Sequence, residues 1–142
     1  MNFETFKQML NYFPVSERVP MVITNMTRNH YPFIETIKEW RKIEPVHVVM
    51  VNDVDGITDI SQIAGAMAND KVPSTYIFDF SGITNVEENV KNFMKFALCR
   101  NFNGHCVPDN AKIIIYTNNG NDELFDGIDD YWICHGWFCR LV

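Results

Sequence analysis

The chemistry that this sequence could support centres on the junction between residues 19 and 40. An apolar run, residues 19–24, is followed by a polar loop, residues 25–30, and then by an amphipathic segment, residues 31–40. This pattern predicts a strand, a tight loop and a helix. In an α/β domain such a junction presents the free N–H groups of the helix N-terminus at the carboxyl edge of the sheet, where anionic ligands often bind. The loop contains no glycine, although a backbone that winds closely around phosphates usually needs one.

Two further patterns suggest metal chemistry but have the wrong spacing. Structural zinc sites favour ligand pairs two to four residues apart in turns, whereas Cys134 and Cys139 lie five apart in a segment that we predict to be a strand. The string Asp-Val-Asp-Gly at residues 53–56 resembles the start of a calcium loop, but its twelfth position is Ala64 instead of glutamate. We therefore expect no metal and no cofactor. The four cysteines are expected to be buried, reduced thiols, with a disulfide or a metal site as the alternative.

Composition limits the class of protein. A chain of 142 residues suits a single domain with its own core, and 46% hydrophobic against 21% charged residues is ordinary for a globular protein. The net charge of −6 argues against a broad basic face for duplex nucleic acid. No apolar run approaches the roughly 18–20 residues that span a bilayer. We expect a cytoplasmic protein that makes no contact with a membrane.

Strand and helix patterns alternate along the chain. Apolar runs predict five strands, and the second, at residues 46–51, is expected to be buried on both faces. Such alternation predicts a single α/β domain over residues 1–142, a three-layer sandwich around a mainly parallel five-stranded sheet, with residues 1–17 as an N-terminal lead-in helix. The expected strands are residues 19–24, 46–51, 74–80, 111–117 and 133–142, and the expected helices are residues 3–12, 31–40, 60–69 (capped by Thr58 or Asp59), 86–99 and a short acidic one from 122.

The order and spacing of these elements resemble the core of the AAA+ ATPases, a P-loop NTPase family, most closely its MoxR-like and dynein-related type. The resemblance covers residues 18–142. In that family the first strand is followed by a Walker A loop. This loop has two glycines separated by four residues, and then Lys and Thr or Ser. Here Thr24 and Asn29 occupy the glycine positions, His30 the lysine position and Tyr31 the hydroxyl position. A β-branched residue resists the phosphate-wrapping backbone, and a neutral imidazole cannot replace the ammonium, so we expect no tight triphosphate binding.

The other motifs of the family are also altered. The segment before Phe80 is similar to Walker B, and Asp79 matches its magnesium-associated aspartate, but Phe80 replaces the glutamate that would orient water. Asn118 matches the sensor 1 asparagine. Tyr131 stands where the family has its finger arginine, and the chain ends without the helical lid. The resemblance therefore implies a protein that is not an enzyme.

Two groups of residues are candidate sites. The first is a vestigial nucleotide site, for which the alternative is that Asp79 only caps the turn after its strand. The second is a nucleic-acid or partner surface, in which basic groups would contact a phosphate backbone and aromatic rings would stack on bases. The vestigial site comprises Asn29, His30, Tyr31, Asp79 and Asn118, and the candidate surface comprises Arg28, His30, Tyr31, Lys91, Lys95, Arg100 and Phe102.

These patterns lead to one functional expectation and one alternative. We expect a non-enzymatic AAA+-like scaffold that has lost nucleotide binding and acts as an adaptor or inhibitor, through a protein partner or self-association. Its compactness suits a viral gene product, which would act in the host cytoplasm. The alternative is an accessory protein of transcription or replication that binds single-stranded DNA.

Overall fold

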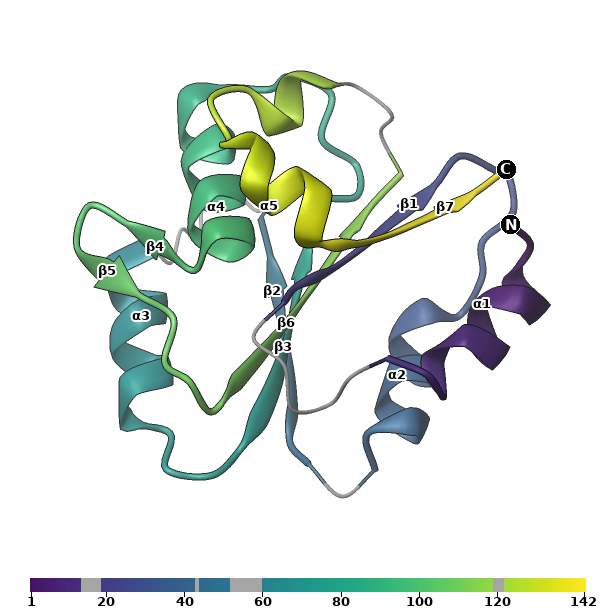
Figure 1. Cartoon of the computed structure of the whole chain (residues 1–142), viewed down its shortest axis with the longest axis horizontal. Helices are drawn as coiled ribbons and strands as arrows, with labels where there is room; N and C mark the ends of the chain where they lie inside the picture. Colours follow the sequence, from purple (N-terminus) through teal and green to yellow (C-terminus); the bar gives the residue numbers. More distant parts are fainter. Residues whose placement is uncertain (14–18, 43, 52–59, 119–121) are drawn as a thin grey trace.

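A computed structural model describes residues 1–13, 19–42, 44–51, 60–118 and 122–142. Five strands form one sheet in the order β2-β3-β6-β1-β7, and every pairing between them is parallel (Figure 1). This confirms the predicted α/β class and the parallel five-stranded sheet. The strands are β1 Met21–Asn25, β2 Val46–Met50, β3 Ser74–Asp79, β6 Ala111–Thr117 and β7 Trp137–Leu141.

Helices cover both faces of the sheet and give the three-layer arrangement (Figure 1). On one face lie α1, Phe3–Leu10, and α2, Phe33–Trp40; on the other lie α3, Ile60–Asn69, and α4, Glu88–Cys99. The connection from β6 to β7 runs on the α4 side through a short 3-10 helix, η1 (Asp122–Phe125), and through α5 (Asp130–His135). Within the ranges described above, no helix is long and apolar enough to cross a membrane.

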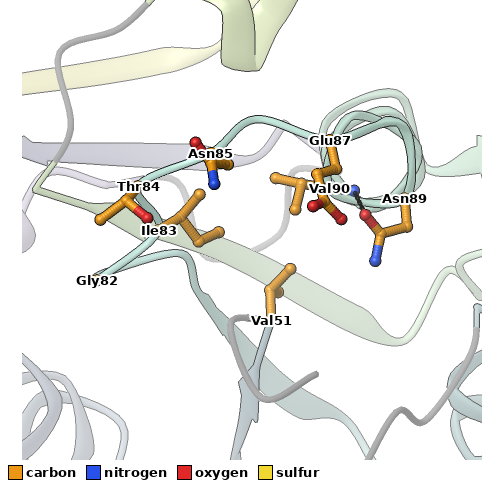
Figure 2. A pocket seen from close by; sticks show the side chains of 8 residues that line it. All are labelled: Val51, Gly82, Ile83, Thr84, Asn85, Glu87, Asn89 and Val90. Carbon is orange, nitrogen blue, oxygen red and sulfur yellow. Dashed lines mark hydrogen bonds between the residues drawn. The ribbon is translucent and has the colours of Figure 1, made fainter. Parts of the chain in front are cut away.

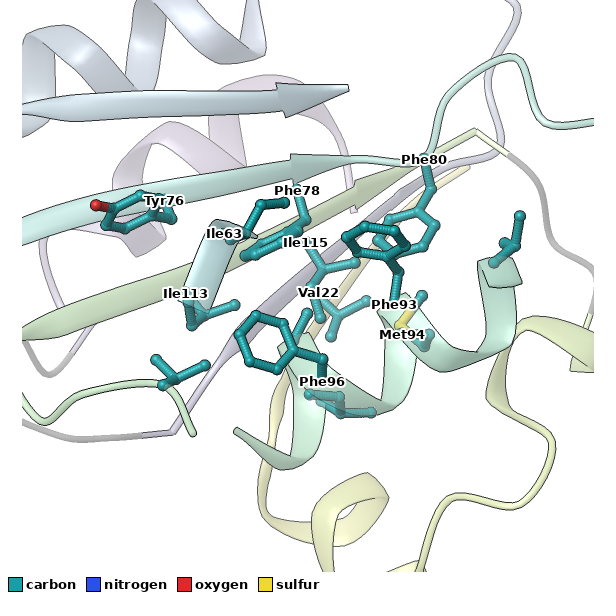
Figure 3. Packing of buried hydrophobic residues seen from close by; sticks show 14 of the residues in the cluster. Val22, Ile63, Tyr76, Phe78, Phe80, Phe93, Met94, Phe96, Ile113 and Ile115 are labelled. Atoms are coloured by element: carbon teal, nitrogen blue, oxygen red, sulfur yellow. The ribbon is translucent and has the colours of Figure 1, made fainter. Parts of the chain in front are cut away.

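Alternation along the strands divides the core into two clusters. In β1, Met21 and Ile23 face α1 and α2, whereas Val22 faces α3 and α4. Because successive side chains of a strand point to opposite faces, an entirely apolar strand can serve both clusters. Phenylalanines fill much of the α4 side, where Phe78 and Phe96 meet edge to face at 6.2 Å between ring centroids (Figure 3).

The segment after α4, which the sequence predicts to be a loop, contains a small hairpin. Arg100 ends the helix in the left-handed conformation (φ 62°), and two short antiparallel strands follow, β4 (Asn101–Phe102) and β5 (His105–Cys106). Asn103 and Gly104 join them with positive φ angles of 51° and 80°. Asn-Gly favours such a two-residue turn because both positions must adopt φ > 0.

Two other element predictions need correction. The strand predicted for residues 133–142 starts only at Trp137, because α5 occupies Asp130–His135. The Asp129 side chain accepts the Tyr131 N–H at 2.9 Å, an N-cap contact that starts this helix. Strand β2 was expected to be buried on both faces, but it is an edge strand with exposed His47 and Met50. The predicted cap at residues 58 and 59 and the turn at residues 52–56 lie outside the described residues.

The cysteines differ in accessibility, which corrects the expectation that all are buried. Cys106 is exposed, Cys99 is half-buried and Cys139 is buried, and all three are free thiols. Burial raises the pKa of Cys139 to about 11 and also raises the pKa of Cys99, with the Asp129 carboxylate adding to the latter shift. Since the thiolate is the reactive form, Cys106 should be the most reactive of the three.

We expect a maleimide or disulfide reagent at mildly alkaline pH to modify Cys106 rapidly in the folded protein. Cys139 should react only after denaturation, because it is both inaccessible and protonated. Peptide mass spectrometry after brief labelling measures both rates. The variant Cys106→Ser should lose the fastest labelling among the three described thiols, and labelling of Cys139 at the rate of Cys106 would contradict the packing around β7.

Candidate functional site

The fold has a topological switch point between β1 and β6. These neighbouring strands pair in register, with Thr24 opposite Thr117. The chain then leaves β1 toward α2 on one face and leaves β6 toward η1 on the other face. In open α/β sheets, ligands bind outside the carboxyl ends of strands at such a point. The loops after β1, β3 and β6 therefore meet where a ligand site would be expected.

The loop after β1 is filled by its own side chains. Asn25, which is 4% exposed, accepts hydrogen bonds at Oδ1 from the Thr27 N–H at 3.1 Å and the Thr27 hydroxyl at 2.6 Å. Its amide nitrogen donates to the Asn29 carbonyl oxygen at 3.1 Å. An asparagine that bonds to the backbone two residues on makes an Asx turn, which tightens a loop without glycine. Asn25 and Thr27 thus occupy the space inside this turn.

The same bonds use backbone groups that a phosphate-binding loop would direct at its ligand. The Met26 N–H donates to the Leu141 carbonyl oxygen at 2.8 Å, and the Asn29 N–H donates to the Thr27 hydroxyl at 3.2 Å. No residue from 26 to 32 has a positive φ angle. An anion-binding nest alternates right- and left-handed residues so that successive N–H groups converge. This loop lacks that conformation, and the N–H groups of Met26, Thr27 and Asn29 are already bonded within the protein.

The proposed phosphate-facing residues lie on the outside of this loop. Arg28, Asn29 and His30 are exposed. Tyr31 is half-buried, and its hydroxyl accepts the Asn29 side-chain amide at 3.1 Å. The Tyr31 ring stacks on Phe3 of α1 with 4.6 Å between ring centroids. The N-terminal helix therefore already covers a face of the ring that was a candidate for stacking on a base.

Asp79 and Asn118 both fix the loop between β3 and α4. Asp79 is buried, and its Oδ1 accepts the Ser81 N–H at 2.8 Å. Asn118 Oδ1 accepts the Gly82 N–H at 3.3 Å. The capping alternative for Asp79 therefore has direct support. The two side chains act on neighbouring amides, and both hold the turn that begins at Phe80.

Phe80 lies in the core rather than at the mouth of a site. Its side chain is fully buried among the residues of α4 (Figure 3), and its N–H donates to the Tyr116 carbonyl oxygen at 2.7 Å. A catalytic glutamate must reach water and substrate. The position that matches the Walker B glutamate is here part of the hydrophobic cluster.

The candidate nucleic-acid surface is not assembled as one patch. Arg100 is 4% exposed, and its guanidinium donates to the carbonyl oxygens of Ala111 at 3.0 Å and Pro108 at 2.7 Å. Tyr31 packs with α1 and α2, whereas Phe102 packs with α3 and α4, so the sheet separates them. The Arg100 side chain is thus buried and binds backbone carbonyl oxygens, so it is not placed to contact a phosphate.

Two lysines of the same set lie against the segment that follows η1. Lys91 forms an ion pair with Asp126 at 3.3 Å. The end of the Lys95 side chain lies 3.2 Å from where a Cβ on Gly127 would be, so glycine leaves room for it. The Lys91–Asp126 ion pair reduces the positive charge that α4 can offer to a nucleic acid.

A shallow pocket of about 190 Å³ opens beside the carboxyl end of β2 (Figure 2). Its polar lining was missed by the sequence analysis, because isolated Thr, Asn and Glu in a loop carry no distinctive spacing. Within it Asn89 Oδ1 accepts the N–H of Val90 at 2.9 Å. The lining residues are Val51, Gly82, Ile83, Thr84, Asn85, Glu87, Asn89 and Val90.

Comparison with the profiles of known protein families and with curated proteins found no match. Among the described residues, no three His, Cys, Asp or Glu side chains lie close enough together to hold a metal ion.

Proposed function

We propose that this protein is a non-enzymatic binding protein, an AAA+-like scaffold that has lost nucleotide binding and acts as an adaptor or inhibitor. The observation that carries this proposal is the loop after β1. Its interior is filled by Asn25 and Thr27, and the amides of Met26 and Asn29 are bonded within the protein. A triphosphate would have to displace these contacts without gaining a lysine or a glycine-rich backbone.

The sheet order supports the scaffold part of the proposal. A nucleotide site built from the motifs that the sequence resembles needs the strands before Walker A, Walker B and sensor 1 to be close neighbours. The order β3-β6-β1 meets this condition. It also differs from the two strand orders that are common in doubly wound dinucleotide- and flavin-binding folds.

The direct test is isothermal titration of the protein with ATP and Mg²⁺, combined with a thermal unfolding scan. We expect no binding heat and no rise in melting temperature. The scan is sensitive enough for this purpose, because a ligand that binds and is present at 100 times its Kd would stabilise the fold by about 2.7 kcal/mol. The variant Asn25→Ala, which empties the turn, serves as the matched comparison and should not bind either, because no lysine is present. Micromolar affinity for ATP in the unmodified chain would overturn the proposal.

Single-stranded DNA binding is the weaker candidate. The net charge is −6, Arg100 is internal, and Tyr31 is covered on one side by Phe3. We also propose that the protein is of viral origin and acts in the cytoplasm of a host cell. Neither affects the titration.

A further inference from the structure

The two edges of the sheet are protected differently. At the β7 edge, the Met1 amino group donates to the Arg140 carbonyl oxygen at 3.0 Å, and the Val142 N–H donates to the Met1 carbonyl oxygen at 3.3 Å. The Arg140 side chain is exposed on the same strand. Backbone contacts and charges of this kind prevent an edge strand from pairing with another chain. Within the described part of the chain, the β2 edge has neither: Val46–Met50 contains no Lys, Arg, Asp or Glu.

The register shows which backbone groups of β2 point outward. The Thr75 N–H donates to the Pro45 carbonyl oxygen at 2.9 Å, and the Val51 N–H donates to the Asp79 carbonyl oxygen at 3.0 Å. Residues of a strand alternate between its two sides, so the odd-numbered positions bond to β3. The N–H and C=O groups of the even-numbered positions therefore face away from the sheet; these are Val46, Val48 and Met50.

A shallow groove lies directly beside this edge. It has a volume of about 420 Å³, and α3 contributes Ala66 and Asn69 to it. His47 of β2 packs against the Tyr76 ring at 4.8 Å between centroids, which forms the floor of the groove. The Ala66 side chain is small and exposed, so it does not obstruct a second helix packed beside α3.

We propose that two copies of this chain pair through β2 in an antiparallel, two-fold symmetric contact that joins their sheets, with the two α3 helices side by side. Centred on Val48, this pairing places Val46 opposite Met50 of the second copy, so every outward N–H and C=O group meets a partner. A second copy fits because a two-fold interface brings the same residues of both chains together, and Val46–Met50 itself has no Lys, Arg, Asp or Glu to repel its own copy. Asp70, which also lines the groove, lies 3.5 Å from the His47 Nε2 atom. This inference rests on the proposed function in one respect: it identifies the β2 edge as one surface through which such a binding protein makes contact.

The test is the mass of the protein in solution, measured by light scattering after gel filtration over a dilution series. We expect twice the mass of one chain for the unmodified protein. Met50→Lys places a charge at an exposed position of the edge and should give the mass of one chain. Phe138→Lys is the matched control, since Phe138 is a similarly exposed apolar residue on the opposite edge, and it should keep the double mass.

A pair of substitutions on α3 tests the helix contact. Ala66→Arg keeps a good helix former but fills the groove, and it should weaken dimerisation about tenfold or more. Gly65→Ala changes a position on the same helix that does not line the groove. It should raise the melting temperature and leave the dissociation constant unchanged.

A single-chain mass for the unmodified protein at every concentration overturns the dimer. So does a dimer that survives Met50→Lys, whatever the effect of Phe138→Lys. Circular dichroism of each variant shows that the fold is kept, so that loss of mass is not loss of structure. ATP titration is independent of these measurements, and the dimer and the loss of nucleotide binding can therefore fail separately.

Discussion

Replacing Phe80 with glutamate should lower the free energy of unfolding by about 3–5 kcal/mol or more. Truncating a buried phenylalanine to alanine already costs that much. The substitution restores the residue that the Walker B resemblance asks for, but Phe80 is fully buried in the α4 cluster. A carboxylate there would lose its hydration without gaining a partner. Urea unfolding followed by circular dichroism measures the change in the free energy of unfolding.

Two comparison variants make this result specific. Phe80→Leu keeps an apolar side chain, and it should fold with a smaller loss. Tyr12→Glu introduces the same charge at a position that is 79% exposed and should change stability by no more than about 0.5 kcal/mol. If Phe80→Glu were as stable as the unmodified protein, the side chain at this position would have to reach solvent.

Replacing Arg100 with methionine should lower the free energy of unfolding by about 1–3 kcal/mol, the cost of taking the charged donor from a buried acceptor. The change removes the guanidinium donors to the carbonyl oxygens of Ala111 and Pro108, and the Pro108 oxygen keeps its bond from the Ala111 N–H at 3.1 Å. Hydrogen exchange at residues 107–111 should accelerate with the loss of these guanidinium bonds. Denaturant unfolding gives the magnitude.

The same variant separates the internal role of Arg100 from a role in nucleic-acid binding. A phosphate-contacting arginine on the surface could be removed with little effect on stability, and single-stranded DNA binding would weaken. Arg100→Lys is the comparison, because it keeps the charge and loses the forked pair of donors. A methionine variant with unchanged stability would contradict the buried geometry.

The sheet was predictable because each central strand contains a run of consecutive apolar residues. Residues 74–79 are buried at every position, as a strand between two layers of helices should be. The edge position of β2 was not predictable in the same way. The apolar run of β2 resembles the runs of the central strands. Which strand lies at the edge is decided only by how segments distant in the sequence pair with one another.

The start of α5 illustrates how a local contact overrides strand propensity. Trp132 and Ile133 favour a strand, yet the Asp129 cap on Tyr131 begins a helix there. In the candidate site, the missing glycines agree with a loop that has no positive φ angle between residues 26 and 32. That Phe3 would cover Tyr31 could not be inferred, because the two rings come from segments with no shared sequence pattern.

Arg100 shows the limit of an argument from charge. Arginine is almost never fully buried unless it is paired, so a basic residue at the end of a helix was expected on the surface. Its left-handed backbone instead turns the chain, and the guanidinium finds carbonyl oxygens several residues further on. Which carbonyl oxygens the Arg100 guanidinium can reach depends on the path of the loop between the hairpin and β6.

The position of β1 within the sheet bears on how the chain folds. Met21 pairs with Ile114 on one side and with Trp137 on the other, so the first strand of the sheet acquires both of its neighbours from the last two. Strands β2 and β3 can pair much earlier during synthesis. The sheet order therefore implies a slow, high-contact-order closing step, in which the apolar β1 waits unpaired until nearly all of the chain is available.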